Sequence, residues 1–215
     1  MKIATLLSYL FFPSKLLFSS KYHKNIRIGY SYGHMTLFTG NISQSGGEYV
    51  FMWKKAIDYA DKQNHEVMNC LVLGVGGGTV VGVVKSKYPL CKITGIEIDQ
   101  QMINAANKYF GLGKFRDLEL LKADACNWVS KNKSKFDLII CDLFIDELNP
   151  DCSRTEEFLV GVKKLLNKNA SILYNSHYRK DDPKEYEEFK ILCSKLYKRV
   201  EEIHQFPKNR VLFIS

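Results

Sequence analysis

The sequence lacks several patterns that would assign the chain to a class at once. Its six cysteines form no Cys-x-x-Cys pair, and no segment matches a recognised nucleic-acid-binding motif. Several of these cysteines lie in apolar runs, where they would pack as small buried side chains. We therefore expect six unpaired cysteines in a cytoplasmic protein, with no metal site. The cysteines are Cys70, Cys91, Cys126, Cys141, Cys152 and Cys193.

A long apolar run is also missing. The stretch over 3–12 is too short to span a bilayer, Pro13 and Lys15 interrupt it, and no clear small-x-small cleavage site follows. We expect residues 1–25 to form an amphipathic segment that docks on the domain or on a second copy of the chain. Peripheral contact with a membrane is the second alternative.

The composition is that of an ordinary globular protein. The chain has 215 residues, of which 46% are hydrophobic and 25% charged, so it fits one domain with a small extension. The net charge of +8 comes from lysines scattered over expected helices rather than from one block. A solvated surface explains them, although a basic field also attracts phosphate without sequence specificity.

The most informative segment is a glycine turn that follows a short apolar run. Gly74, Gly76 and Gly78 occupy alternate positions, and a helical pattern begins directly after them. Glycines are retained where the backbone needs positive φ or where a ligand approaches the main chain. About twenty residues later a second strand pattern ends at Glu97, where a carboxylate would meet a ribose diol. Asp99 is expected to cap the helix that follows. The alternative for the two patterns together is a plain tight connection and an acidic helix cap, without a ligand.

Strand and helix patterns alternate after residue 68. This order predicts a Rossmann-like α/β fold with a mostly parallel sheet and a C-terminal antiparallel hairpin, as in seven-stranded enzymes that use S-adenosylmethionine (SAM). A short β-hairpin over 25–39 and a linking helix over 48–64 precede it, so we expect units at 26–67 and 68–215. The expected strands are 71–74, 91–98, 118–122, 137–141, 171–174, 199–204 and 210–214, and the helices 80–88, 100–110, 125–131, 155–166 and 183–197. Asp182, Pro183 and Glu185 predict a capping box at the last helix.

Several motifs together resemble the core of spermidine synthases, in order and in spacing. They are Gly74 to Gly78, Gly95 to Asp99, Lys122 to Ala125, Phe136 to Asp142 and Thr155 to Phe158. The resemblance covers about residues 26 to 215, with the N-terminal domain of that family shortened to one hairpin.

The resemblance implies a role for each matching residue. Gly74, Gly76 and Gly78 would pass under the amino-acid or aminopropyl part of the nucleoside. Glu97 would accept hydrogen bonds from the ribose, Ile98 would pack on the adenine, and Asp124 with Ala125 would read the adenine amino group. Asp142 would face the sulfonium centre, and Gln44 would close the site. Asp124 and Asp142 could instead serve as simple caps.

Two departures from the family pattern concern the acceptor. The family places a second aspartate three residues after Asp142, where this sequence has Ile145, and Asp146 is one residue away. The family's Tyr-His pair, which binds the diamine, is replaced by Trp53-Lys54, and a lysine repels a dication.

These departures favour a spermidine synthase-like transferase that moves a methyl group from SAM to an unidentified small-molecule acceptor. The candidate acceptor-side residues are Tyr49, Asp142 and Asp146, followed by His34. The alternatives are a polyamine aminopropyltransferase that uses decarboxylated SAM, with Asp146 as the base, and a non-catalytic nucleoside-binding domain. A homodimer is a further expectation.

Overall fold

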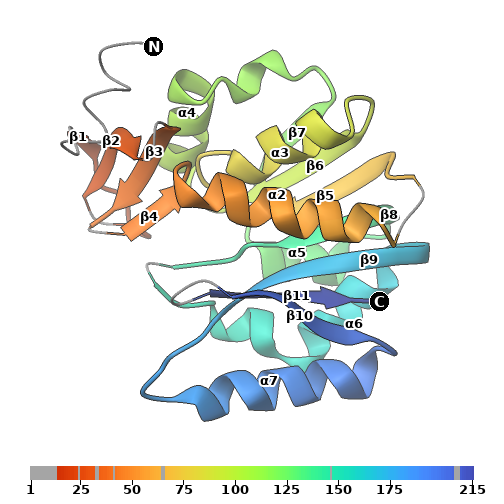
Figure 1. The fold of residues 1–215 in the computed structure, drawn as a ribbon. Coiled ribbons are helices and arrows are strands. Elements are labelled where there is room, and N and C mark those ends of the chain that lie inside the picture. Colours follow the sequence, from red (N-terminus) through yellow and green to blue (C-terminus); the bar gives the residue numbers. More distant parts are fainter. Residues whose placement is uncertain are drawn as a thin grey trace.

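The computed structural model describes residues 14–23, 25–31, 34–40, 42–63, 66–145, 147–205 and 209–215. A central seven-stranded sheet runs through it in the order β10-β11-β9-β8-β5-β6-β7 (Figure 1). The pairs from β9 to β7 are parallel, and β11 joins both β9 and β10 antiparallel, which confirms the expected fold class. The strands are β5 (Asn69–Leu73), β6 (Lys92–Glu97), β7 (Leu118–Lys122), β8 (Phe136–Cys141), β9 (Leu166–His177), β10 (Val200–Gln205) and β11 (Asn209–Ile214).

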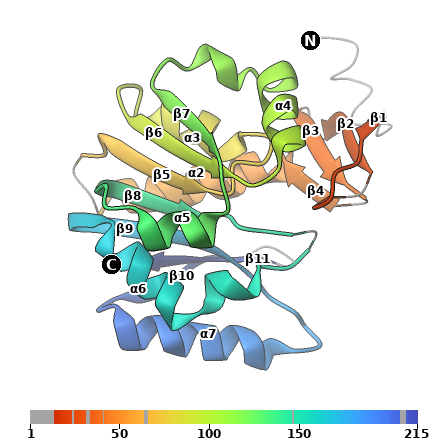
Figure 2. The ribbon, with the colours of Figure 1, turned by 180° about the vertical axis from the view of Figure 1, so that it is seen from behind.

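Helices cover both faces of this sheet. The helices α2 (Glu48–Asp61), α3 (Thr79–Lys87) and α4 (Gln100–Tyr109) lie on one side, and α5 (Ala125–Lys131), α6 (Glu156–Lys164) and α7 (Pro183–Leu196) on the other (Figures 1 and 2). Two short 3₁₀ turns complete the domain, η1 (Leu112–Lys114) and η2 (Asp151–Arg154). Each face has its own apolar core, because the strands are buried on both sides.

The N-terminal part forms a four-stranded antiparallel sheet rather than one hairpin. The expected hairpin is present as β2 (Ile26–Ser31) and β3 (His34–Thr39), and β1 (Ser14–Phe18) and β4 (Ile42–Ser45) extend it on either side. The sequence analysis missed both outer strands, because β1 lies in the interrupted apolar start and β4 is a polar segment of a glycine-bearing loop. Residues 1–13, the core of the expected amphipathic segment, lie outside the described residues.

This small sheet packs beside α4 (Figures 1 and 2). Ile26 and Leu37 pack against Met102 and Ala105 on the helix face that the sequence periodicity predicts. The contact brings the end of β4 to the glycine turn, where the Ser45 hydroxyl accepts a hydrogen bond of 3.0 Å from the Gly77 amide. The N-terminal sheet therefore helps to form the wall of the site described below.

Helix caps agree with the sequence in two cases out of three. Asp99 caps α4 by accepting from the Gln101 amide at 2.9 Å, and Asp124 caps α5 by accepting from the Asn127 amide at 2.8 Å. At α7, Pro183 occupies the first turn, but the predicted capping box is absent because Asp182 makes no side-chain cap bond. The Glu185 carboxylate instead pairs with Arg154, 3.3 Å away.

Candidate active site

A pocket opens at the carboxyl ends of β5, β6 and β8. Gly74, Glu97 and Asp142 line it, and each directly follows or ends one of these strands. In a sheet of parallel strands this edge is where a ligand meets loops and helix N-termini. Gln44 of β4 and Tyr49 of α2 line the same pocket from the N-terminal side.

The glycine turn has the backbone that its sequence predicts. Gly74, Gly76 and Gly78 all have positive φ, at 86°, 53° and 88°. A Cβ on Gly74 would lie 2.2 Å from the backbone oxygen of Asp142, so only glycine fits there. Gly74 and Gly76 line the pocket. Gly78 does not; it is the N-cap of α3, where a Cβ would meet the Leu112 side chain at 2.1 Å.

Glu97 links the glycine turn to the next strand. Its carboxylate accepts from the Gly76 amide at 2.8 Å and from the Asp99 amide at 2.9 Å, and the residue is 7% exposed. Burial raises the pKa of this carboxyl, and these backbone donors oppose the rise. Each carboxylate oxygen retains a second lone pair, so both can accept from a ribose diol.

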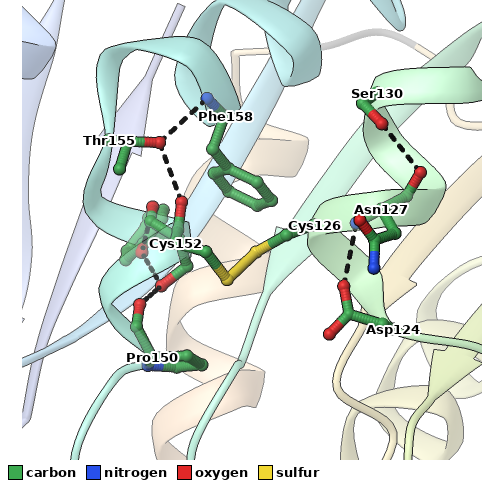
Figure 3. The surroundings of a disulfide bond; sticks show 10 residues. Asp124, Cys126, Asn127, Ser130, Pro150, Cys152, Thr155 and Phe158 are labelled. Atoms are coloured by element: carbon green, nitrogen blue, oxygen red, sulfur yellow. Dashed lines mark hydrogen bonds between the residues drawn. A yellow bond between two sulfur atoms is a disulfide. The ribbon is translucent and has the colours of Figure 1, made fainter.

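The N-terminus of α5 forms the opposite wall, and its surroundings contradict the expectation of six unpaired cysteines. Asp124, Ala125 and Cys126 line the pocket, and Cys126 forms a disulfide with Cys152 of η2 (Figure 3). The two cysteines are 26 positions apart. Their pairing depends on the contact between α5 and η2, which no local sequence pattern encodes. The other four, Cys70, Cys91, Cys141 and Cys193, are unpaired and buried as expected.

Asp142 lies at the centre of a buried polar cluster. The Asn175 amide donates to its Oδ1 at 2.8 Å, so Asp142 is not a simple turn cap. Protein surrounds the carboxyl although one side faces the pocket, and burial raises its pKa to about 7. The donor from Asn175 and the indole N–H of Trp53 oppose this rise, and the charge of Glu97 adds to it.

The remaining predicted residues fall in different places. Tyr49 lies near Asp142, and its hydroxyl donates to the Asn209 Oδ1 at 3.5 Å. Burial raises the pKa of the Tyr49 phenol. Ile98 lines the pocket, whereas His34 lies outside it and stacks edge-on against Phe51. Asp146 lies outside the described residues.

Several pocket residues were missed by the sequence analysis. Glu147, His177 and Asn209 line the pocket, and Asn175 holds Asp142 from behind. A signal existed for Asn175, because polar residues near the carboxyl end of a parallel strand commonly face a ligand. Asn209 begins an antiparallel strand, where no such rule applies.

The charge of the pocket differs from that of the whole chain. Four carboxylates line it, from Glu97, Asp124, Asp142 and Glu147, and no lysine or arginine does among the described residues. The lining therefore favours a cationic ligand, although the chain carries +8 overall. Within the described part of the chain no group of three or more potential metal ligands converges.

These residues fit an adenosyl sulfonium compound. A positive-φ glycine turn leaves room for the chain beside the sulfur, Glu97 offers acceptors for the ribose, and the acidic lining suits the sulfonium charge. In the described residues, no helix has the length and apolarity needed to cross a membrane.

Comparisons with known proteins agree with this geometry. A polyamine aminopropyltransferase of Clostridium perfringens is 31% identical over 153 residues, which are 69% of this chain and 51% of the relative. The chain likewise spans less than two thirds of the other curated relatives it matches, such as 36% of a polyamine aminopropyltransferase from Vibrio vulnificus.

Solved structures show the same fold. A spermidine synthase in complex with the transition-state analogue AdoDATO matches with a TM-score of 0.69 at 18% identity. The match covers 94% of this chain and 72% of the spermidine synthase chain. Human methyltransferase-like protein 13 in complex with SAH matches with a TM-score of 0.68, also at 18% identity. This match covers 78% of this chain and 82% of the human chain. At this identity, the likeness concerns the fold alone.

The match to a family model identifies the family of this chain. The model described as "Spermine/spermidine synthase domain" matches residues 54–205, a span that includes every strand of the central sheet up to β10. The family's cofactor class is the expected one, SAM or its decarboxylated form. The chain belongs to the spermine/spermidine synthase family.

Proposed function

We propose that this protein transfers an aminopropyl group from decarboxylated SAM to an amine of a di- or polyamine. The observation that carries the proposal is the acidic lining of the pocket, which suits both a sulfonium donor and a polycationic acceptor. The methyl transfer expected from the sequence is wrong, because the matching family model describes spermine/spermidine synthases and the relatives from Clostridium perfringens and Vibrio vulnificus are polyamine aminopropyltransferases.

The lysine that replaces part of the family's diamine-binding pair lies away from the pocket. Lys54 does not line the pocket; it lies on the outer side of α2 and forms an ion pair with Asp58 at 3.6 Å. Trp53, its neighbour, is fully buried beneath Asp142. Replacement of the family's Tyr-His pair therefore adds no cation to the acceptor side of the site. No lysine or arginine of the described residues lines the pocket, so the net charge of +8 gives no measure of the charge there.

A second carboxylate lines the pocket close in sequence to Ile145, the position where the family has its second aspartate. Ile145 is 42% exposed and forms a β-bridge with Leu148. The turn closed by this bridge contains Glu147, whose side chain lines the pocket. Glu147 thus offers a second carboxylate near Asp142 without the bulge that Asp146 would require.

Binding in this proposal begins with the nucleoside. Glu97 accepts from the ribose hydroxyls, Ile98 packs on the adenine, and Asp124 with the Ala125 backbone reads the adenine amino group. Gly74 and Gly76 leave space for the aminopropyl chain, and Gln44 covers it from β4. The sulfonium compound, when bound, supplies an activated carbon next to a good leaving group.

Asp142 has the central chemical role. An aliphatic amine is protonated at neutral pH, so it must lose a proton before its nitrogen can attack. A carboxyl with a pKa of about 7 is a stronger base than an ordinary aspartate and is still charged above that pH. Asp142 accepts this proton first, and the freed lone pair of the nitrogen then attacks the carbon beside the sulfur, so that the C–N bond forms as the C–S bond breaks and methylthioadenosine leaves.

The same carboxylate sets the preference for the donor. SAM carries a carboxylate that decarboxylated SAM lacks, and we expect that group to lie near Asp142, where two negative charges repel. The pocket should therefore bind decarboxylated SAM more tightly than SAM. Affinities for the two compounds, measured by calorimetry above pH 8, test this step alone.

Turnover is tested with purified protein, decarboxylated SAM and putrescine. We expect formation of spermidine and methylthioadenosine, with a loss of at least about 100-fold in Asp142→Asn, in line with removal of a general base. Glu119→Gln, at an exposed position of β7, is the matched control and should retain activity. Absence of methylthioadenosine with any di- or polyamine, while the nucleoside still binds, would contradict the proposal.

A further inference from the structure

A chain of hydrogen bonds crosses four elements of the fold and ends on Asp142. The Tyr49 hydroxyl of α2 donates to the Asn209 Oδ1 of β11 at 3.5 Å. The Asn209 amide donates to the Asn175 Oδ1 of β9 at 3.0 Å, and the Asn175 amide donates to the Asp142 Oδ1 after β8 at 2.8 Å. Every donor in this series points toward the carboxylate.

The direction of the chain follows from the charge at its end. An ionised carboxylate only accepts, so Asn175 must present its NH₂ group to Asp142 and its carbonyl to Asn209. Asn209 must then present its NH₂ group to Asn175 and its carbonyl to Tyr49. The Tyr49 hydroxyl at the far end must therefore donate its hydrogen bond to Asn209.

Burial protects these hydrogen bonds from competition by water. Asn175 is fully buried and Asn209 is 6% exposed, so water does not compete with the two amides. Asn149 also fixes the backbone of Asn175, because the Asn149 side-chain amide donates to the backbone carbonyl oxygen of Asn175 at 3.0 Å. The amide of Asn175 therefore has little freedom to turn away from Asp142.

Trp53 approaches the same carboxyl from the core. Its side chain is fully buried, and its indole N–H forms no hydrogen bond of standard geometry with the described residues, although it lies near enough to the Asp142 carboxyl to lower the pKa of that group. This N–H favours the charged form of Asp142 over the protonated form. A buried donor without a standard hydrogen bond is costly, so its position beside an acidic group needs an explanation other than packing.

We propose that Asn175, Asn209 and Tyr49, together with Trp53, are positioning residues that hold Asp142 charged, with its free oxygen toward the acceptor. The inference rests on the proposed function, in which Asp142 accepts the proton of the amine. It deepens that function by assigning the ionisation of the base to residues on three other elements. Trp53, which replaces a family diamine-binding residue in the sequence, acquires a role on Asp142 instead.

Other titratable groups face Asp142 and must be considered with it. The Glu97 carboxylate on β6 disfavours the charged form of Asp142, and Cys141 and Tyr49 are neutral at physiological pH because burial raises the pKa of each. His177 of β9, Glu147 and Asp124 line the same pocket. Removal of Asn175 leaves all of these in place, so the effect of its amide can be isolated.

The test uses Trp53 as a reporter of the ionisation of Asp142. The chain has two tryptophans, so Trp128→Phe leaves Trp53 as the single tryptophan, whose emission can be followed by selective excitation. Its fluorescence should titrate with a midpoint near 7 in this background, and the transition should disappear in Asp142→Asn. Asn175→Ala should move the midpoint upward by about one pH unit, the scale of one hydrogen bond to a charged group.

The same strand provides a matched control. The Asn167 amide of β9 donates to Asp137 Oδ1 of β8 at 2.6 Å, an Asn–Asp pair of the same type at the opposite end of the two strands. Asn167→Ala should leave the midpoint unchanged. Asn209→Ala should move it in the same direction as Asn175→Ala by a smaller amount, and it tests the chain from another element if Asn175→Ala does not fold.

The outcomes separate this inference from the proposed function. A midpoint that does not move in either folded Asn175→Ala or folded Asn209→Ala overturns the inference, as does a transition that persists in Asp142→Asn. A midpoint that moves as expected in a protein without aminopropyl transfer supports the positioning chain and contradicts the proposed function. In an active enzyme, the acid limb of the rate profile should move with the fluorescence midpoint.

Discussion

Glu97 shapes the glycine turn and, in the proposed function, also accepts hydrogen bonds from the ribose. Its carboxylate already binds the Gly76 and Asp99 amides, so it shapes the glycine turn before any ligand arrives. This is the residue that the pattern of a glycine turn followed by an acidic strand end predicts. The sequence could identify it because both halves of the pattern are local.

We expect Glu97→Ala to weaken binding of methylthioadenosine by roughly 1–3 kcal/mol, the cost of losing hydrogen bonds to a charged group. Isothermal calorimetry would measure the change. Glu119→Ala is the control, since that carboxylate is exposed on β7. Unchanged affinity in Glu97→Ala would remove this residue from the ligand site.

Asp142 should make the protein less stable as pH rises. Its pKa is about 7 in the folded protein, compared with an ordinary value near 4 in the unfolded chain. Between these values the unfolded state releases a proton that the folded state keeps, so the free energy of unfolding falls until the pH passes about 7. The group stabilises the fold only while it is protonated.

Asp142→Asn should therefore be more stable than the natural chain at pH 8, by up to about 4 kcal/mol for three pKa units. The difference should shrink toward zero as the pH falls to about 4. Urea unfolding at pH 5, 6, 7 and 8 would measure it. A difference that stays constant over this range would show that the pKa of Asp142 is not raised.

At the scale of elements, the disulfide joins α5 to η2 at the edge of the pocket (Figure 3). Both cysteines line the pocket, and α5 also carries Asp124 and Ala125. The cross-link therefore fixes the helix N-terminus that would read the adenine. The expectation of a cytoplasmic location was based on six reduced cysteines. The Cys126–Cys152 disulfide means that two of the six are not reduced, so this basis no longer holds.

Thiol titration of the denatured, unreduced protein should yield four thiols, and reduction should raise the number to six. Cys126→Ser should lower the free energy of unfolding by about 3.5 kcal/mol, the chain-entropy value for a closed loop of this length. The double variant Cys126→Ser/Cys152→Ser should show a similar loss. Six thiols without reduction would show that the pair does not form.

The whole molecule depends on contact between its two sheets. The end of β4 reaches the glycine turn, where Ser45 accepts from the Gly77 amide and the Gly46 amide donates to the Thr79 hydroxyl. These bonds join the N-terminal sheet to the N-terminus of α3. The two sheets should consequently unfold together.

Ser45→Ala should destabilise the protein by about 1–3 kcal/mol, because the buried Gly77 amide loses its acceptor. Thermal unfolding followed by circular dichroism should still show a single transition. Ser130→Ala, on an exposed turn of α5, is a control that should have little effect. Two separate transitions in the natural chain would show that the sheets are independent.

The sequence by itself determined the central domain almost element by element. The predicted strands and helices agree with β5 to β11 and α3 to α7 to within a few residues, apart from the longer β9. Hydrophobic periodicity, caps and glycine turns are local signals, so the chain carries them wherever it folds. The glycine turn and Glu97 follow from the same local patterns, whereas the role expected for Asp124 came from the resemblance to spermidine synthases.

Only the tertiary structure decided the acceptor side and the cross-link. The acidic lining combines Glu97, Asp124, Asp142 and Glu147 from separate elements, and no composition count shows that none of the described lysines and arginines lines the pocket. The Asn175–Asn209 contact and the Cys126–Cys152 pair join positions distant in the chain. Such contacts depend on how the elements pack, because electrostatic and hydrogen-bond energies depend on distance in space rather than on separation in sequence.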